Sequence, residues 1–229
     1  MNPFNLVSLG GATGVTGSCH LLQAQGLNIL IDCGIPQGRD TAVPMEQWPV
    51  LPREIHFLFL THAHIDHIGR VPELVRRGFK GEILCTHGTK ALLGPMLRDA
   101  MSLAGNPQEE AGRLEQVIDG LSWGFEYNET FDLKRAIRFR LYRAGHILGS
   151  CVIRLECRGP DWAVVFSGDL GAKDTPILPD PEIPDPCDLL VLESTYGDRN
   201  HDDRKQRVAR LGRLLQRALS DGGRVLIPA

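Results

Sequence analysis

The sequence lacks the features that direct a chain into or across a membrane. Residues 1–5 have neither the basic region nor the long apolar run of a secretory signal. No apolar stretch elsewhere approaches the roughly 20 residues that a membrane-spanning helix needs. We therefore expect a soluble, cytoplasmic protein without a membrane partner.

The sequence also has no cysteine pattern and no strong excess of charge of one sign. Its six cysteines include no CxxC pair and no regular spacing, so we expect buried free thiols rather than a disulfide framework. The 25 basic and 28 acidic residues give a formal net charge of −3. The chain as a whole therefore has no general attraction for nucleic acid, and binding of nucleic acid would need a local basic patch.

The 229 residues are enough for one large domain or two small ones, and 42% are hydrophobic, which is ample for a core. Apolar and alternating runs predict strands at 6–9, 20–24, 27–31, 55–60, 82–86, 137–142, 150–156, 162–166, 189–192 and 225–229. Helical spacing predicts helices at 71–77, 90–103, 109–119 and 203–220. The pattern favours an α/β fold, and we expect the polar helix at 109–119 to form part of a cap over a functional site.

One short segment concentrates residues that bind metal ions. Residues 61–67 read Thr-His-Ala-His-Ile-Asp-His and directly follow the apolar strand at 57–60. In α/β proteins, side chains at the carboxyl end of a strand point into the crevice that holds ligands. Imidazole and carboxylate suit zinc, and also iron or manganese. A solvated polar turn would not explain four potential ligands within six positions, so the segment predicts a metal site.

Other ionisable residues also stand where predicted strands end. Asp32, Asp169 and Glu193 each follow an apolar strand, and His146 follows the alternating strand at 137–142. A carboxylate buried alone would be costly unless it were paired or bound to a metal. Any one of these residues alone could cap a loop, but together they predict a single shared pocket.

These residues resemble the successive motifs of the metallo-β-lactamase fold. Asp32, the His62-x-His64-x-Asp66-His67 segment, His146 and Asp169 follow the order of that fold's four motifs. Residues 192–199 (Leu-Glu-Ser-Thr-Tyr-Gly-Asp-Arg) are similar to the acidic motif of its β-CASP branch, as are residues 15–18 and 223–229. The resemblance implies an αββα sandwich at 1–200, followed at 201–229 by the first helix and strand of an incomplete β-CASP domain. β-CASP members are metal-dependent ribonucleases and relatives that act on DNA, and they include the endonuclease that cleaves pre-mRNA 3′ ends.

The resemblance also implies a role for each matched residue. His62, His64 and His146 would hold a first zinc ion, Asp66 and His67 a second, and Asp169 would bridge the two. Asp32 and Glu193 would orient ligands or a catalytic histidine, so the acidic residues of catalysis would be Asp32, Asp66, Asp169 and Glu193. Two later histidine motifs of the family have no counterpart here, and a buried-type strand at 225–229 would need neighbours on both sides. We therefore expect a fragment that is truncated at its C-terminus.

The implied activity is hydrolysis of a phosphodiester by a hydroxide that two metal ions activate. RNA is the expected partner, single-stranded DNA is the alternative, and a homodimer is a further expectation. Arg199 is the strongest candidate for a phosphate contact, ahead of the arginines at 135–143, whereas those on the final helix are expected to be solvated. Two other functions stay open, namely a small-molecule hydrolase for thioesters or lactams and a truncated, non-catalytic binding protein.

Overall fold

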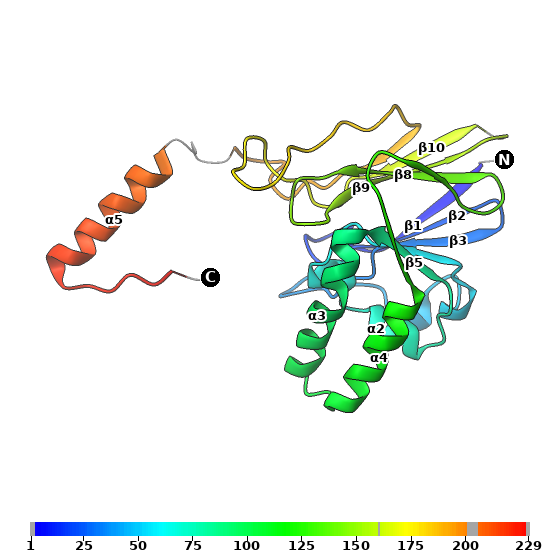
Figure 1. Cartoon of the computed structure of the whole chain (residues 1–229), viewed down its shortest axis with the longest axis horizontal. Coiled ribbons are helices and arrows are strands. Elements are labelled where there is room, and N and C mark those ends of the chain that lie inside the picture. Colours follow the sequence, from blue (N-terminus) through cyan, green and yellow to red (C-terminus); the bar gives the residue numbers. More distant parts are fainter. Residues whose placement is uncertain (1–2, 160, 201–205, 228–229) are drawn as a thin grey trace. The chain divides into compact units, whose positions relative to one another are not determined.

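The computed structural model describes residues 3–159, 161–200 and 206–227. The chain divides into two compact units, Met1–Glu193 and Ser194–Ala229. The first unit contains two β-sheets and four α-helices, and the second contains one α-helix, within the part of the chain that the structure describes (Figure 1). None of the helices within these ranges combines the length and the apolar character needed to cross a bilayer.

The first sheet has six strands in chain order, β1 Phe4–Gly10, β2 Cys19–Ala24, β3 Leu27–Ile31, β4 Phe57–Phe59, β5 Glu82–Thr86 and β6 Ser122–Phe125. Strands β1 to β3 pair antiparallel, and β3 to β6 run parallel. The tight turn between β2 and β3 uses Gln25 and Gly26, both with positive φ, as a two-residue hairpin requires. Because β3 and β4 are parallel, the residues that follow them meet at one edge of the sheet.

The second sheet has the order β11-β10-β9-β8-β7, with β7 Thr130–Asp132, β8 Ile137–Arg143, β9 Cys151–Cys157, β10 Trp162–Phe166 and β11 Leu189–Val191. Neighbours from β7 to β10 are antiparallel, and β10 and β11 are parallel. Strands β8, β10 and β11 therefore all end at the same edge. The alternation at 137–142 is a half-buried strand as predicted, with Phe139 in the core and Arg138 partly exposed.

The two sheets pack face to face around an apolar core. Phe59 of β4 meets Phe139 of β8 with ring centroids 5.0 Å apart, and Leu155 and Phe166 belong to the same buried cluster. A second core cluster lies between the first sheet and the helices α1 Ile65–Ile68, α2 Val71–Arg76, α3 His87–Leu103 and α4 Gln108–Leu121. The expected α/β sandwich is confirmed.

Helix α4 does not cap the site, which corrects the expectation for residues 109–119. Its buried face, Ala111, Leu114 and Ile118, joins the cluster that also contains residues of α3. Apolar residues at helical spacing need a partner surface, and the first sheet and α3 provide it. In the first unit, the described helices all pack against this sheet, whereas Leu170 and Cys187 of the segment after β10 pack against the second.

The second unit contains α5, Arg207–Asp221, which ends at Gly222 in the left-handed conformation, φ 68°. The predicted helix at 203–220 is therefore found, although residues 203–205 lie outside the described residues. The predicted strand at 225–229 is wrong where it can be described, because residues 223–227 have no strand pairing and Leu226 is 91% exposed. An apolar run becomes a strand only when a neighbour accepts its backbone hydrogen bonds. Residues 228–229 lie outside the described residues.

Candidate metal centre

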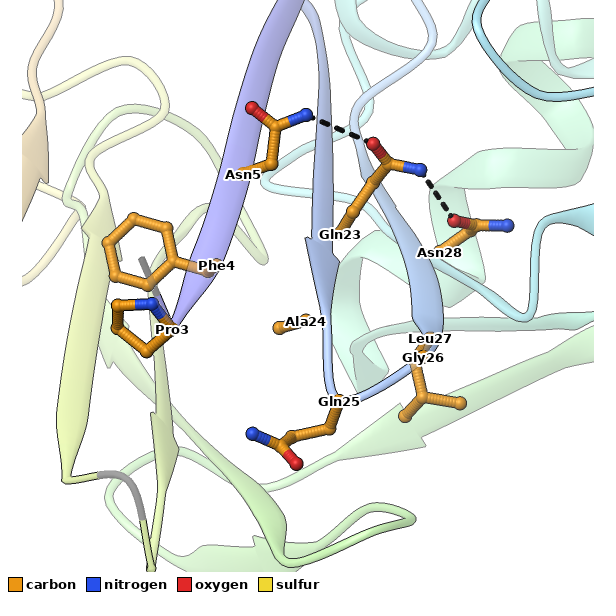
Figure 2. A pocket seen from close by; sticks show the side chains of 9 residues that line it. All are labelled: Pro3, Phe4, Asn5, Gln23, Ala24, Gln25, Gly26, Leu27 and Asn28. Carbon is orange, nitrogen blue, oxygen red and sulfur yellow. Dashed lines mark hydrogen bonds between the residues drawn. The ribbon is translucent and has the colours of Figure 1, made fainter. Parts of the chain in front are cut away.

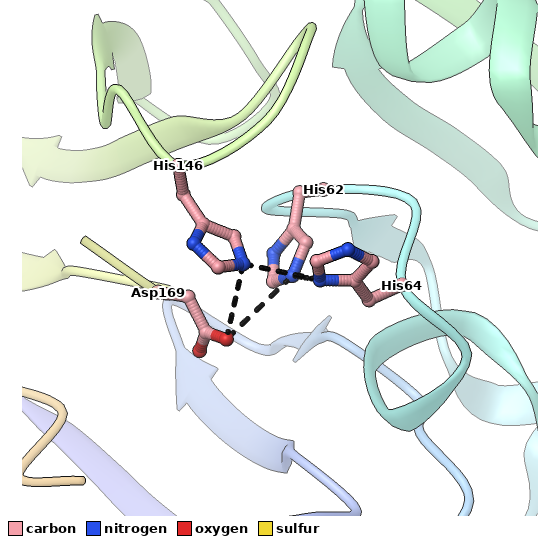
Figure 3. Close-up of side chains that lie close together, drawn as sticks. All are labelled: His62, His64, His146 and Asp169. Carbon is pink, nitrogen blue, oxygen red and sulfur yellow. Dashed lines mark hydrogen bonds and ion pairs between the residues drawn. The ribbon is translucent and has the colours of Figure 1, made fainter. Parts of the chain in front are cut away.

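Four potential ligands converge at the edge where the strands of both sheets end. His62 and His64 follow β4, His146 follows β8, and Asp169 follows β10. One ligand atom from each of these residues lies within 4.8 Å of all the others, and Figure 3 shows the side chains pointing toward one another. Three segments far apart in the chain therefore bring nitrogen and oxygen donors to one point.

The spacing of these atoms matches a metal site better than a hydrogen-bond network. His64 Nδ1 lies 3.0 Å from His62 Nε2 and 3.1 Å from His146 Nε2. A ring nitrogen carries either one proton or one lone pair, so His64 Nδ1 can serve only one of these partners. Ligands about 2.0–2.1 Å from a tetrahedral zinc ion would be separated by roughly 3.3 Å. The donor set therefore fits a cation at its centre.

Asp169 faces two groups of residues with its two carboxylate oxygens. Oδ2 lies 3.8 Å from His62 Nε2 and 3.5 Å from His146 Nε2. Oδ1 lies 3.2 Å from His67 Nε2, and that same nitrogen lies 3.8 Å from Asp66 Oδ2. One carboxylate thus stands between the three-histidine cluster and the Asp66–His67 pair, which is the placement that a bridging ligand needs.

Asp32 orients the ring of His67 through its Nδ1 atom. It is buried, with 1% exposure, and adopts a positive φ of 57° after β3. His67 Nδ1 lies 2.8 Å from Asp32 Oδ2, and the Thr61 backbone N–H donates to Oδ1 over 2.8 Å. The hydroxyl of Ser18 also donates to Oδ2. Because Nδ1 of His67 is directed to Asp32, Nε2 is left to face Asp169.

The pKa values follow from burial and from these charge partners. Burial lowers the pKa of His62 to about 2, and the neighbouring His67 contributes to the shift. Burial also tends to lower the pKa of His67, but the carboxylates of Asp32 and Asp169 outweigh it and raise the pKa to about 10. Burial tends to raise the pKa of Asp169, whereas His67 lowers it to about 2. His62 is therefore neutral and Asp169 ionised, as ligands must be, and His67 must release a proton before it can bind a cation.

The loop that carries His146 is held by two threonines that the sequence analysis did not single out. The Ser150 hydroxyl oxygen accepts the backbone N–H groups of His146 and Ile147 at 3.0 and 3.2 Å. The hydroxyl groups of Thr86 and Thr89 both donate to the Gly149 carbonyl, at 2.6 and 2.8 Å. Only the tertiary structure reveals this role, because these threonines precede the loop by about 60 residues.

The loop that carries Asp169 depends on glycines and on Glu193. A Cβ atom on Gly171 would lie 1.7 Å from the Gly145 carbonyl oxygen, so the Asp169 and His146 loops touch only because this position has no side chain. Glu193 Oε1 accepts the Leu170 backbone N–H over 2.7 Å. Glu193 therefore lies behind the loop and acts on Asp169 through the backbone.

The segment at 15–18 is hydrogen-bonded to the loop that carries Asp66. The Ser18 backbone N–H donates to the Asp66 carbonyl over 2.9 Å. Asp40 in turn accepts hydrogen bonds from the backbone of Val15 and Thr16. Residues 15–18 thus fix the backbone of the ligand loop at Asp66.

Among the basic candidates, carboxylates pair with Arg138, Arg140, Arg143 and Arg199. Arg138 forms an ion pair with Glu156, and Arg143 forms one with Glu182 at 2.8 Å. Such pairing leaves them little free charge for a phosphate. Arg199 belongs to the second unit, where its guanidinium lies 5.3 Å from the centre of the Tyr196 ring. Its predicted contact with substrate stays a prediction.

A separate pocket lies at the opposite end of β3. Figure 2 shows its lining, in which the side-chain amides of Asn5, Gln23 and Asn28 are joined by two hydrogen bonds of 3.1 Å. The nine lining residues include no acid, base or histidine. Hydrolytic chemistry is therefore better supported at the histidine cluster.

Two packed sheets with histidine and aspartate donors at their common edge define an α/β sandwich whose donor set fits a metal ion. The family model of the metallo-beta-lactamase superfamily matches residues 12–228, and the chain belongs to this superfamily. Solved structures agree on the fold. The metallo-beta-lactamase fold protein YhfI from Bacillus subtilis matches with a TM-score of 0.51 and 14% identity, over 76% of this chain and 65% of that one. A protein of unknown function from Enterococcus faecalis matches with a TM-score of 0.52 and 20% identity, over 72% of this chain and 43% of that one.

Curated relatives cover nearly the whole chain. Ribonuclease TTHA0252 from Thermus thermophilus is 38% identical over 97% of this chain and 51% of its own length. Endoribonuclease YSH1 from Eremothecium gossypii is 30% identical over 99% of this chain and 31% of its own length. Cleavage and polyadenylation specificity factor 73 from Drosophila melanogaster is 33% identical over 96% of this chain and 33% of its own length. The chain thus spans about half of the first relative and about a third of the others. The predicted resemblance to this superfamily and its RNA-processing nucleases is confirmed.

Proposed function

We propose that the protein containing this chain is a metal-dependent phosphodiester hydrolase of the β-CASP branch that cleaves RNA. The observation that carries the proposal is the convergence of His62, His64, His146 and Asp169 on one point. The names of the relatives, ribonuclease and endoribonuclease, supply the substrate class. In this proposal, residues 201–229 begin the β-CASP domain and Arg199 contacts a phosphate.

The ligand residues form two groups, one for each proposed metal position. His62, His64 and His146 would hold the first ion through Nε2, Nδ1 and Nε2, and Asp66 and His67 would take part in holding the second. Asp169 would serve both positions, since its two oxygens face different groups. A set rich in imidazole within a compact, closely spaced cluster favours zinc, with iron or manganese as alternatives.

Bound divalent ions would supply positive charge that stabilises a developing phosphoryl oxyanion and makes a bound water more acidic. The protein's own residues set the conditions for this chemistry. Asp169 stays ionised because its pKa is low, and Asp32 holds His67 with Nε2 directed to Asp169. Glu193 keeps the Asp169 loop in place through Leu170. Catalysis would thus depend on carboxylates that position ligands as much as on the ligands themselves.

The test combines metal analysis with cleavage of a labelled single-stranded RNA by the full-length protein. Asp169→Asn should abolish cleavage and lower metal content, because a neutral amide binds a divalent cation poorly. Asp99→Asn is the matched control, since it makes the same chemical change at an exposed residue of α3. Retained RNA cleavage by Asp169→Asn with full metal occupancy would refute the proposal.

Parallel assays separate the alternatives. A single-stranded DNA of the same sequence tests the choice of nucleic acid, and thioester and lactam substrates test the small-molecule hydrolase. Turnover of a thioester or lactam without cleavage of RNA would overturn the proposed substrate class while leaving the metal centre intact.

A further inference from the structure

The hydroxyl of Thr61 lies at the point where the two groups of ligands meet. Its Oγ1 is 3.1 Å from His62 Nδ1 and 3.3 Å from His67 Nδ1. The same oxygen lies 2.9 Å from Asp32 Oδ2 and 3.1 Å from Oδ1. One buried hydroxyl therefore touches an imidazole of the first position, an imidazole of the second and the carboxylate behind them.

The hydrogen-bonding capacity of a hydroxyl matches these three partners. Threonine Oγ1 carries one proton and two lone pairs. Asp32 is an acceptor when ionised, so the Thr61 proton goes to Asp32. The lone pairs are then available to N–H groups at Nδ1 of His62 and of His67, and His67 also donates to Asp32. Each partner is satisfied by a single arrangement of protons.

That arrangement determines which ring nitrogen can bind a cation. A neutral imidazole has one N–H and one nitrogen with a free lone pair. The hydrogen-bond partner of the N–H decides which of the two nitrogens carries the proton and which can bind a metal ion. With the proton on Nδ1, His62 presents the lone pair of Nε2 to His64 and Asp169. His67 in the same state presents Nε2 to Asp169. Both rings are thus held in the form that a metal ligand requires.

We infer that Thr61 is a positioning residue that couples the two metal positions by holding His62 and His67 in the Nδ1–H form through one hydroxyl shared with Asp32. The inference rests on the proposed metal-binding function and deepens it. Thr61 does not touch the cation positions itself. Its removal should weaken both positions together, because both imidazoles lose a partner at the same time.

Burial makes this role sensitive to substitution. Thr61 is 1% exposed and His62 is 1% exposed, so water does not readily replace a lost hydrogen-bond partner. Thr61→Val keeps the shape of the side chain but removes the hydroxyl, whereas Thr61→Ser keeps the hydroxyl. Loss of a hydrogen-bond partner behind a metal-binding histidine typically lowers metal affinity about 10–100-fold. We expect that range for Thr61→Val at both positions and wild-type affinity for Thr61→Ser.

The experiment measures the stepwise zinc affinities of the full-length protein by competition with a chromophoric chelator. Ser150→Ala serves as the matched control, since Ser150 supports only the His146 loop and should weaken the first position alone. Cobalt substitution gives an absorption spectrum that reports ligand geometry at each position. Wild-type affinities in Thr61→Val, or equal losses in Thr61→Val and Thr61→Ser, would overturn the inference.

A second measurement needs no variant, in case Thr61→Val does not fold. Nitrogen-15 NMR of the zinc-loaded wild-type protein assigns the protonated nitrogen of each histidine. Nδ1–H on both His62 and His67 supports the inference, and Nε2–H on either ring overturns it. Absence of zinc binding by the wild-type protein would instead refute the proposed function, so the two failures are distinguishable.

Discussion

Replacing Asp32 by asparagine removes one charge from a carboxylate that is almost completely buried. Its two oxygens accept hydrogen bonds from Thr61, His67 and Ser18, and donors face both oxygens. An amide has only one acceptor oxygen, so its NH2 group must face a donor whichever way it is turned. Breaking one partner of such a buried, charge-assisted group costs about 3–5 kcal/mol. We expect Asp32→Asn to destabilise the metal-free protein by that amount near pH 6.5.

The loss should depend on pH in a defined direction. Asp32 and Asp169 raise the pKa of His67 from 6.5 to about 10 against the effect of burial. A raised pKa in the folded state stabilises the protein fully below the unfolded value, and this stabilisation disappears as the pH rises through the folded value. Wild type should therefore lose stability between pH 6.5 and about 10. Asp32→Asn removes the negative charge that contributes most to raising the pKa of His67. The stability of this variant should therefore change less than that of wild type over the same pH interval.

The assay is urea unfolding of chelator-treated protein across this pH interval, with Asp99→Asn as the control at an exposed position. The free energy of unfolding should differ most between wild type and Asp32→Asn at the acidic end, and the difference should shrink toward pH 10. Equal stability at pH 6.5, or a difference that stays constant with pH, would refute the reasoning about His67 and Asp32.

Further predictions concern the loops and the metal. Gly171→Ala should cost metal affinity and stability, because its Cβ would meet the Gly145 carbonyl at 1.7 Å, whereas Gly112→Ala, with nothing within 4 Å, should stabilise α4 by roughly 0.5–1 kcal/mol in thermal unfolding. Glu193→Ala should weaken cation binding about 10–100-fold, measured by chelator competition, because the Leu170 N–H loses its acceptor. Arg199→Ala should weaken RNA binding and reduce the salt slope by about 1, and an unchanged slope would exclude a phosphate contact. Chelation should lower the melting temperature of the wild-type protein, and an unchanged melting temperature would count against a metal bound to the folded state.

Local pattern predicted the strands and helices that bury an apolar face. The strands at 27–31, 82–86 and 162–166 have the predicted bounds, because each is a nearly continuous apolar run, which is typical of a strand buried on both faces. Strands β6 and β7 were missed, since Ser122–Phe125 contains a glycine and Thr130–Asp132 is only three residues long. Their extended conformation comes from pairing with β5 and β8, which a single segment does not reveal.

The surface charges and the last strand show the same limit. Arg138 and Arg143 appear in the sequence as free basic residues, but their glutamate partners lie 18 and 39 positions away. The apolar run at 225–227 has the composition of a strand and no strand pairing among the residues described. Composition indicates which residues can pair or bury a surface, and only the neighbours decide whether they do.

The order of residues along the chain by itself determined that histidines and carboxylates follow the strands, and the direction of each strand carries them to one edge. The tertiary structure alone decided how they face one another. Asp169 directs its oxygens to different groups, and Thr61 joins His62 to His67 through Asp32. The Asp169 contacts join loops that follow strands of different sheets, and Asp32 reaches Thr61 and His67 from 29 and 35 positions away in the sequence. Such contacts are set by packing between segments remote in sequence, and periodicity within one segment carries no information about them.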